Sequence, residues 1–497
     1  MYIFLTTIVI ILFMTFIFEV NKKKFYKLKK NLEFVISLPG ASIFSSLVDS
    51  LQIACNYKEL INCIDAVTKK YGNLTRFILG TDIFVVLTKP EDYKLVLTNV
   101  NGNYKSSVTQ TWKAILGDGI IRASGASHKL RRKIIHPLMN IKYLSEYITY
   151  FDSNLCMDIL EKNVDGPMFD LKPYIEQYAF NIFLVTTVGI QGIANKDGLD
   201  ILHKQKELFK DAYSKVIKPW LRLNWIFSLT GNRKQMCIAE KTLIDFIYNI
   251  SPRKSENYTA LQRNNYNMTI FQELKPIFNN YWDRVEEIRA NVSNKSCDVS
   301  YENFLDDIRN FFAAIQNTIT EATSFIMLML AIHTDVQEKL RQEILVTFNN
   351  DKIAQRLLNM PYLNMVFQET LRLFPIVPII SRQLTEDIKL ESCTLPEGCY
   401  VMIPIFAIHR NPKYWYKPLE FIPERFSSTH CRYTYIPFGM GLRDCVGQKY
   451  AFLIVATIIV NLLRRYRFVT VGNLNNIKTT ADIVLRPQHV KMSITRI

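Results

Sequence analysis

The chain has 497 residues, which is enough to bury a large core, and nothing in this length requires several domains. Its nine cysteines are odd in number and include no Cys-x-x-Cys pair, which argues against a disulfide framework and indicates a reducing compartment. The formal net charge of +16 leaves three classes of partner open: nucleic acid, an anionic membrane surface and an acidic protein.

The N-terminal segment favours the membrane among these partners. Residues 2–18 are apolar apart from three threonines, which is close to the minimum length for spanning a bilayer. Six lysines follow between residues 22 and 30, and no small-residue cleavage site precedes them. We therefore expect a transmembrane signal anchor at residues 1–20, a basic linker at 21–40 and a single globular domain at 41–497 on the cytoplasmic side. The alternative is a cleaved signal peptide and a secreted product.

The first half of the globular domain is predicted to start with a β-hairpin and to continue as helices. Residues 76–88 are rich in Ile, Phe and Val and are divided by Gly80-Thr81-Asp82, which is typical of two strands joined by a tight turn. Pro90 and two acidic residues after it predict the start of a helix. From about residue 125 to 309 the pattern is mostly helical, and one of these helices is predicted at 278–290.

Two stretches of this helical region are unusual in charge or aromatic content. A basic cluster leads to Pro137 and is either a solvated face or a site for an anion or a partner. Residues 218–227 combine two tryptophans with cations, which fits either a membrane-interface contact or a buried aromatic cluster. The basic cluster consists of Lys129, Arg131, Arg132 and Lys133.

The C-terminal half begins with a long helix, predicted at residues 301–333. Hydroxyl and amide side chains at 313–320 lie within its apolar part, where they are costly unless they face a partner, water or a ligand. A later helix carries Glu369 and Arg372 on one face. Helices are predicted at 335–346 and 363–374, strands at 379–390 and 400–408, and a short terminal sheet at 469–497. The predicted fold class is mainly α with small β-sheets (α+β).

One cysteine stands out near the C-terminus. Cys445 lies between Gly441 and Gly447, which suggests tightly turned backbone or a close approach to another group. Helical spacing over residues 448–468 would place the thiol just before a helix N-terminus, where the dipole lowers the pKa of a thiol. A thiolate in apolar surroundings beside a cation, here Arg443, suits a soft axial metal ligand. The simpler interpretation is a buried free cysteine beside a turn.

These segments together resemble the cytochrome P-450 superfamily of haem-thiolate monooxygenases, and the resemblance covers essentially the whole chain. It implies the cytochrome P-450 fold with an N-terminal transmembrane helix, and haem b as the cofactor. Phe438, Arg443 and Cys445 match the cysteine-loop signature. The resemblance therefore implies that Cys445 is the axial thiolate ligand of the iron, that Arg443 meets a haem propionate and that Phe438 belongs to the haem-binding loop.

The resemblance also implies further contacts around the haem. Glu369 and Arg372 match the family's Glu-x-x-Arg helix, and Arg425 completes a buried network that holds the cysteine loop. Arg132 and Arg382 fall where propionate-binding arginines are expected. His128 stands where the family usually has Trp, and histidine can still donate to a carboxylate. These positions are Glu369, Arg372, Arg425, Arg132, Arg382 and His128.

The central helix departs from the family pattern, which is a small residue, Gly, any residue, an acid and Thr. Here the same positions are Ala314, Ile315, Gln316, Asn317 and Thr318. Thr318 is retained and is expected to hydrogen-bond bound oxygen or its water. Asn317 cannot relay a proton by ionising, and Ile315 fills space that glycine leaves open. Ala314 excludes the glutamate–haem ester that forms in many fatty-acid ω-hydroxylases.

Finer resemblance points to microsomal insect members of the fatty-acid ω-hydroxylase clan, on the stretches Leu116-Gly-Asp-Gly119, Pro219-Trp-Leu and Gly447-Gln-Lys-Tyr-Ala451. The implied function is NADPH- and O2-dependent oxidation of small apolar substrates, such as fatty-acid-like molecules, hormones, odorants or xenobiotics. The implied location is the endoplasmic reticulum membrane, with the catalytic domain on the cytoplasmic face. Substrate contacts are expected from residues 101–116, 311–318 and 376–380.

The implied partners are NADPH–cytochrome P-450 reductase and cytochrome b5, and no nucleic acid is expected. Lys129, Arg131, Lys133 and Lys449 are candidates for the reductase contact. Two alternatives stay open. One is a haem-thiolate isomerase or dehydratase, which needs no proton relay and would explain Asn317. The other is a non-catalytic haem- or lipid-binding protein, for which Ile315 is the main argument.

Overall fold

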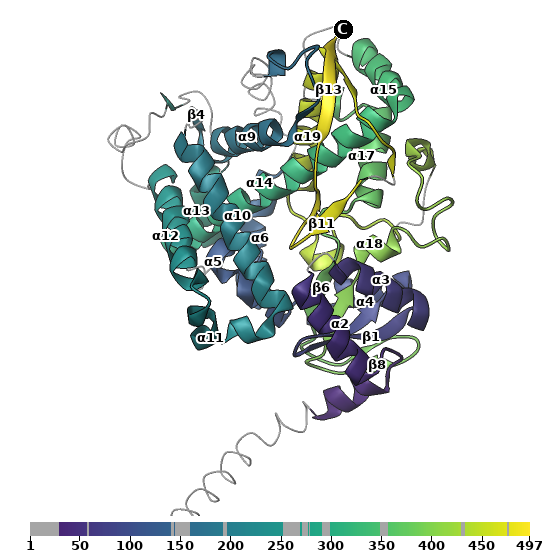
Figure 1. Cartoon of the computed structure of the whole chain (residues 1–497). Helices are drawn as coiled ribbons and strands as arrows, with labels where there is room; N and C mark the ends of the chain where they lie inside the picture. Colours follow the sequence, from purple (N-terminus) through teal and green to yellow (C-terminus); the bar gives the residue numbers. More distant parts are fainter. Residues whose placement is uncertain are drawn as a thin grey trace, which may run out of the picture.

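The computed structural model of the chain describes residues 29–56, 59–140, 144, 160–191, 196–251, 269–270, 277, 279–290, 299–347, 356–428, 433–474 and 477–497. The expected anchor at residues 1–20 lies outside these residues, as does the expected linker up to residue 28. Helices dominate the described chain and small sheets complete it, as the predicted fold class requires (Figure 1).

The longer helices are α2 (Ile43–Cys55), α3 (Glu59–Tyr71), α4 (Pro90–Thr98), α6 (Gly125–Leu138), α9 (Lys172–Ile182), α10 (Lys196–Ile217), α12 (Asn232–Ile250), α13 (Asn279–Ala290), α14 (Tyr301–Ile332), α15 (Thr334–Thr347), α17 (Pro361–Leu373) and α19 (Gln448–Leu463). The short ones are α5 (Lys113–Leu116), α11 (Asn224–Leu229) and α18 (Ile405–Ile408), with the π-helix η3 (Phe183–Val188) and the 3₁₀ helices η1 (Val100–Gly102), η2 (Ser107–Trp112), η4 (Pro219–Arg222), η6 (Pro423–Ser427) and η7 (Gly441–Arg443).

The largest sheet has four strands in the order β1 (Leu74–Leu79), β2 (Asp82–Leu87), β9 (Tyr400–Ile403) and β6 (Ile380–Gln383). The hairpin predicted around Gly80 is confirmed as β1 and β2, and only the β2–β9 pair is parallel. The C-terminal sheet is also confirmed, in the order β10 (Tyr466–Val469), β13 (Lys491–Arg496) and β3 (Phe169–Asp170). The two-stranded sheets pair β4 (Ile190–Gln191) with β5 (Thr269–Ile270), β7 (Ile388–Lys389) with β8 (Thr394–Leu395), and β11 (Thr479–Ala481) with β12 (Leu485–Pro487).

Three predicted boundaries are wrong. The strand predicted at 400–408 ends at Ile403, because Pro404 has no N–H to continue the ladder, and the chain turns into α18. The strand predicted at 379–390 divides into β6 and β7, which pair with different strands. The helix predicted at 448–468 ends at Leu463, because Tyr466 and Phe468 alternate into the core as residues of β10.

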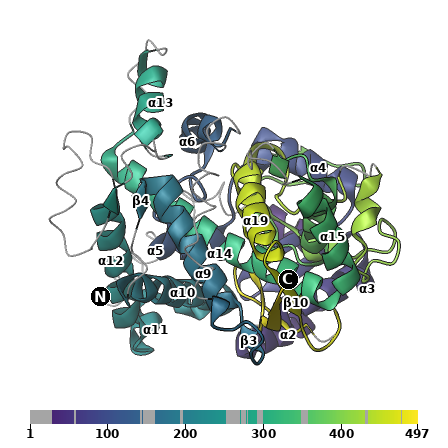
Figure 2. The same ribbon diagram turned by 90° about the horizontal axis from the view of Figure 1, so that it is seen from above.

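Helix α14 is the element around which the others are arranged. It runs through the middle of the molecule, between the α9–α13 helices and the part that contains α17 and the main sheet (Figures 1 and 2). Its N-terminus is capped by the Ser300 hydroxyl, which accepts from the Asn303 N–H. Among the residues described it is the one helix long and apolar enough to cross a membrane, but 89% of its apolar window is buried inside the protein. It is therefore a core helix.

Large apolar side chains are exposed on α2 and on the η4–α11 segment. Phe44 is 78% exposed, and Trp225 is 66% exposed on α11. Phe227 is buried beneath the Lys215 ammonium, 3.9 Å from the ring centroid. Two interpretations of residues 218–227 were open, a buried aromatic cluster and a membrane-interface contact. Phe227 is buried, as the first requires, whereas both tryptophans are exposed, as the second requires.

Gly441 of the turn η7 allows a test of the prediction that the glycines around Cys445 permit a close approach to another part of the chain. Gly441 has φ +75°, and a Cβ there would lie 2.1 Å from the Leu97 carbonyl oxygen of α4, whereas Gly231 has φ +73° and open space around it. We expect Gly231→Ala to lower the free energy of unfolding by about 1–2 kcal/mol through backbone strain alone. Gly441→Ala should cost distinctly more, measured by urea unfolding of both variants. Equal losses would show that contact with α4 does not constrain the loop.

Candidate active site

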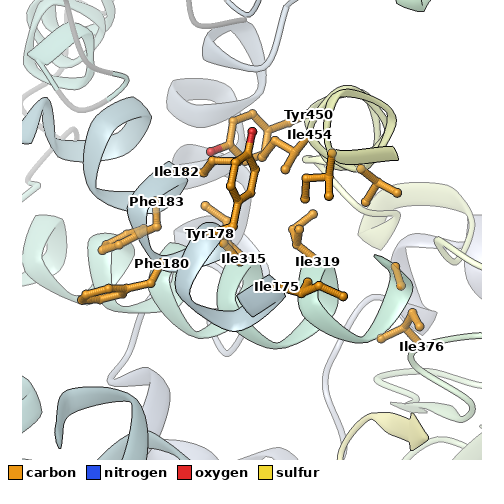
Figure 3. Close-up of a cluster of buried hydrophobic side chains, with 14 of the residues drawn as sticks. Ile175, Tyr178, Phe180, Ile182, Phe183, Ile315, Ile319, Ile376, Tyr450 and Ile454 are labelled. Atoms are coloured by element: carbon orange, nitrogen blue, oxygen red, sulfur yellow. The ribbon is translucent and has the colours of Figure 1, made fainter. Parts of the chain in front are cut away.

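A cavity of about 330 Å³ lies between α14, α6, the start of β6 and the loop that contains Cys445. Most of its wall is apolar, and cationic side chains gather at one part of it. Ile315 and Ile319 of α14, which line it, lie beside Ile175 and Tyr178 of α9 in Figure 3. The wall includes Lys105, Ile120, His128, Arg132, Phe311, Ala314, Ile315, Thr318, Ile319, Phe367, Ile376, Ile380, Arg382, Phe438, Arg443, Cys445 and Gly447.

Cys445 is held at the cavity wall by its own loop. Its N–H donates to the Phe438 carbonyl (2.9 Å), and α19 begins three residues later at Gln448. The side chain is accessible from the cavity, but the protein surrounds it on its other sides. Desolvation therefore raises the pKa of the Cys445 thiol, against a hydrogen bond with the Gly447 backbone that lowers it. The predicted lowering of this pKa by the helix N-terminus alone is wrong, because burial outweighs it.

Five basic side chains, contributed by separate segments, meet at one part of the cavity wall. Burial lowers the pKa of Arg382 to about 10 and, together with Arg382 and Arg132, lowers that of Arg443 to about 9. Burial and the surrounding cations lower the pKa of His128 to about 3, so its imidazole is neutral. The five are Lys105, His128, Arg132, Arg382 and Arg443.

These cations differ in how they are held. Arg443 donates to Asn103 (2.9 Å) and to Ala123, and Arg382 donates to the Ser381 carbonyl (2.9 Å), with its Nε unpartnered among the described residues. Arg132 pairs with Asp444, so any further anion would share its guanidinium with that carboxylate. Lys105, Arg382 and Arg443 form no ion pair within the described chain. Buried cations without counter-ions are costly, and the site therefore favours an anionic ligand.

The residues present fit a haem. The cavity offers an accessible sulfur, apolar walls and unneutralised cations that suit two propionates. Gly447, at the wall near the sulfur, has no described atom within 4 Å of where a Cβ would lie, so a flat group could approach the backbone there.

Glu369 and Arg372 of α17 form a buried network with Arg425 of η6. Glu369 and Arg372 have no exposed surface. Arg372 donates to both carboxylate oxygens of Glu369 (2.7 and 2.9 Å), and Arg425 Nε donates to one of them (3.0 Å). Ile422 N–H donates to the same oxygen (2.8 Å). One carboxylate thus binds two guanidinium groups and the backbone of the 409–425 segment.

The two distal residues singled out on α14 point in different directions. Thr318 lines the cavity, and its hydroxyl donates to the Ala314 carbonyl (2.8 Å). Asn317 is not part of the cavity wall; its amide donates to the Ala313 carbonyl (2.9 Å), and its oxygen accepts from Arg486 (3.2 Å). Ile315 is packed into the apolar wall near Tyr178 (Figure 3). Its side chain takes up part of the cavity boundary, as expected from its sequence position.

Of the four residues expected to contact the reductase, three are exposed and one is buried. Lys129, Lys133 and Lys449 are exposed. Arg131 is 4% exposed and donates to Asp307 (2.5 Å) and to Asn303 of α14. Arg131 is therefore a structural link between α6 and α14, and the expectation that it contacts a partner is wrong.

Comparison with known proteins agrees with this geometry. The Cytochrome P450 family model matches residues 40–494, so the chain belongs to the cytochrome P450 family of haem-thiolate monooxygenases. Cytochrome P450 4c3 of Drosophila melanogaster is 26% identical over 95% of this chain and 91% of its own. Cytochrome P450 4d2 of the same species is 28% identical over 84% of this chain and 85% of its own. Cytochrome P450 4c21 of Blattella germanica is 27% identical over 90% and 91%.

Sequence reasoning missed four residues that the structure brings to the site or next to it. Lys105 lies in a loop with no repeating pattern, so only the fold reveals that it joins the cations. Gln205 and Arg486 lie far from residue 317 in sequence, and long-range pairs leave no local signal. Glu321 did carry a signal, because an acid one turn after Asn317 is unusual inside an apolar helix.

The shared carboxylate generates a stability prediction. We expect Glu369→Gln to lower the free energy of unfolding by about 3–5 kcal/mol, because it removes the buried charge that both guanidinium groups bind. Urea unfolding of the purified protein measures this loss. Glu420→Gln is the matched control: its exposed carboxylate pairs with Lys417, and its loss should cost about 0–1 kcal/mol. Similar costs for both would contradict the assigned role of Glu369.

Proposed function

We propose that this protein is a membrane-anchored, NADPH- and O2-dependent monooxygenase in which Cys445 is the axial ligand of haem b. The observation that carries the proposal is the cavity itself, where one accessible cysteine and three basic side chains without ion pairs among the described residues (Lys105, Arg382 and Arg443) share otherwise apolar walls. Arg382, Arg443 and His128 would bind the propionates, with Lys105 as a further cation and Arg132 shared with Asp444.

Bound haem would supply the activation of dioxygen and the abstraction of hydrogen from the substrate. The chain's own part is to orient the cofactor, exclude bulk water and hold an apolar substrate. Of the three segments expected to contact substrate, 311–318 and 376–380 contribute Phe311, Ala314, Ile376 and Ile380 to the wall, and 101–116 contributes Lys105. This lining favours small apolar molecules such as fatty acids. The Thr318 hydroxyl donates its own proton to the Ala314 carbonyl, so its oxygen would accept a hydrogen bond from a water at the cavity surface.

The proposed electron donor is NADPH–cytochrome P-450 reductase, with cytochrome b5 as a second partner. Lys129, Lys133 and Lys449 are the exposed cations that remain available for an acidic partner surface. Lys449 lies four residues after Cys445, so this contact would be close to the proposed ligand.

The proposed location is the endoplasmic reticulum membrane, with the catalytic domain in the cytoplasm. The apolar stretch at residues 2–18 and the lysines after it support an anchor. The exposed apolar side chains of α2 and α11, including Phe44, Trp225 and Leu229, support a second contact with the bilayer surface.

The function is tested with the full-length protein in vesicles containing the reductase. We expect a thiolate-type carbon monoxide difference spectrum and NADPH-dependent oxidation of lauric acid. Cys445→Ser should abolish both, whereas Cys393→Ser, which changes a half-buried cysteine outside the cavity wall, should abolish neither. Turnover of a hydroperoxide without reductase, and no NADPH consumption, would instead support an isomerase. Haem binding without oxygen consumption would support a binding protein.

Replacement of Arg382 is predicted to stabilise the haem-free protein and to weaken its hold on haem. Arg382→Met should raise the free energy of unfolding of haem-free protein, because it removes a buried cation without an ion pair in the described chain. The same change should speed haem transfer to apomyoglobin, because a propionate contact is lost. Arg410→Met is the control: burial also lowers the pKa of Arg410, to about 9, but Arg410 is outside the cavity wall. Equal haem release from both variants would exclude the propionate role.

A further inference from the structure

Asn317 and Glu321 lie on one face of α14, four residues apart, next to the face that lines the cavity. Glu321 is 2% exposed inside an otherwise largely apolar helix. A buried carboxylate is costly unless it is paired, and Glu321 has two basic neighbours from other elements. Lys172 of α9 donates to it (2.8 Å), and Arg486 Nε of β12 lies 3.8 Å from its second oxygen.

Arg486 connects this carboxylate to Asn317. Its Nη2 donates to the Asn317 oxygen (3.2 Å) and lies 3.2 Å from an Asp482 oxygen. The Asn317 amide group also lies 3.5 Å from the Gln205 oxygen of α10. Arg486 is therefore the common neighbour of Glu321, Asn317 and Asp482, whose side chain is 22% exposed. The next residue, Thr318, faces the cavity.

Two polar atoms beside this group have no hydrogen-bond partner among the described residues, Gln205 Nε2 and Arg486 Nε. Buried polar groups of this kind normally bind ordered water. Thr318 lies three residues before Glu321 on α14, so the two side chains are neighbours on the helix surface, and a water between them would join the carboxylate to the cavity.

We propose that Glu321 supplies the acid that position 317 lacks, and that it delivers protons to the cavity through bound water and Thr318. The proposal rests on the proposed monooxygenase function and names its proton donor. It also explains why an amide can occupy position 317: there it accepts from Arg486 and orients the path, while the ionising group lies one helical turn later.

The stoichiometry of the reaction determines how many protons this path must carry. Oxidation of a substrate RH by O2 and NADPH, with one further proton, gives ROH, water and NADP⁺. The reductase supplies two electrons and two protons enter the site, so each turnover draws protons from Glu321. The carboxylate regains each one from the Lys172 ammonium, which donates to it and recovers its own proton from solvent through its partly exposed side chain, whereas the Arg486 guanidinium stays protonated.

The main experiment measures hydrogen peroxide release and lauric acid oxidation with the full-length, haem-loaded protein and reductase. Glu321→Gln keeps the shape of the side chain but cannot ionise. We expect product formation to fall about 10²-fold and a larger share of NADPH electrons to appear as hydrogen peroxide. Glu240→Gln is the matched control, because it removes a half-buried carboxylate that pairs with Arg309 away from Glu321 and the cavity wall. Unchanged coupling in Glu321→Gln would overturn the proposal.

A rescue separates a proton donor from a structural ion pair. In the Glu321→Gln background, Asn317→Asp restores one carboxylate at a position that already contacts Arg486. Coupling should recover in this double variant if the path carries protons. Failure to recover, with haem still bound, would show that Glu321 only holds Lys172 and Arg486 in place. If wild-type protein consumes no NADPH with reductase, the proposed function fails instead.

A second readout does not depend on turnover. Burial raises the pKa of Glu321 above 4.5, opposed by Lys172 and Arg486 and assisted by Glu176. The folded protein therefore holds this proton more tightly than the unfolded chain, and the stability that it contributes is lost as pH rises through the folded pKa. Thermal unfolding of wild type relative to Glu321→Gln should show this loss above pH 4.5. A difference that does not vary with pH would show that Glu321 does not exchange a proton.

Discussion

The position of Cys445 depends on one buried carboxylate, that of Glu369. Arg372, bound to Glu369, also donates to the His409 carbonyl (2.9 Å), and His409 Nε2 accepts from the Ile436 N–H (3.0 Å). The Ile436 carbonyl accepts from Gly439, and the Phe438 carbonyl accepts from Cys445. The first two bonds join segments 37 and 27 residues apart, and the last two are local to the cysteine loop, so the network connects the position of the thiol to α17. Buried ion pairs add little net stability, so its value is in fixing position.

The same fold keeps a positive region beside a polarisable sulfur. Arg132 comes from α6, Arg382 from β6 and Arg443 from η7, so three separate elements must pack correctly to bring the charges together. Their mutual repulsion and desolvation oppose folding. An anionic ligand would remove this cost, which means that cofactor binding and stability of the domain are coupled.

Much of the fold was predictable because its signals are local. The hairpin around Gly80 and the long helix from Tyr301 have clear periodicity and turn residues, and both are confirmed. The end of α19 and the burial of Arg131 were not predictable, because Tyr466 pairs with a C-terminal strand and Arg131 meets Asp307 across 176 residues. The prediction of a lowered pKa for Cys445 was wrong for a related reason. The helix N-terminus is a local feature, but the burial that outweighs its effect comes from the whole fold.

The two faces of α14 explain how this chain combines an unusual sequence with a familiar architecture. Ile315 and Ile319 pack against α9 and reinforce the apolar wall, so the loss of glycine at 315 is absorbed by packing. Asn317 and Glu321 face Arg486 on the adjacent side, where charge is already balanced by Lys172 and Asp482. The helix thus has an apolar side that lines the cavity and a charged side that contacts Lys172 and Arg486, with Thr318 between them. A change on one face therefore need not disturb the other.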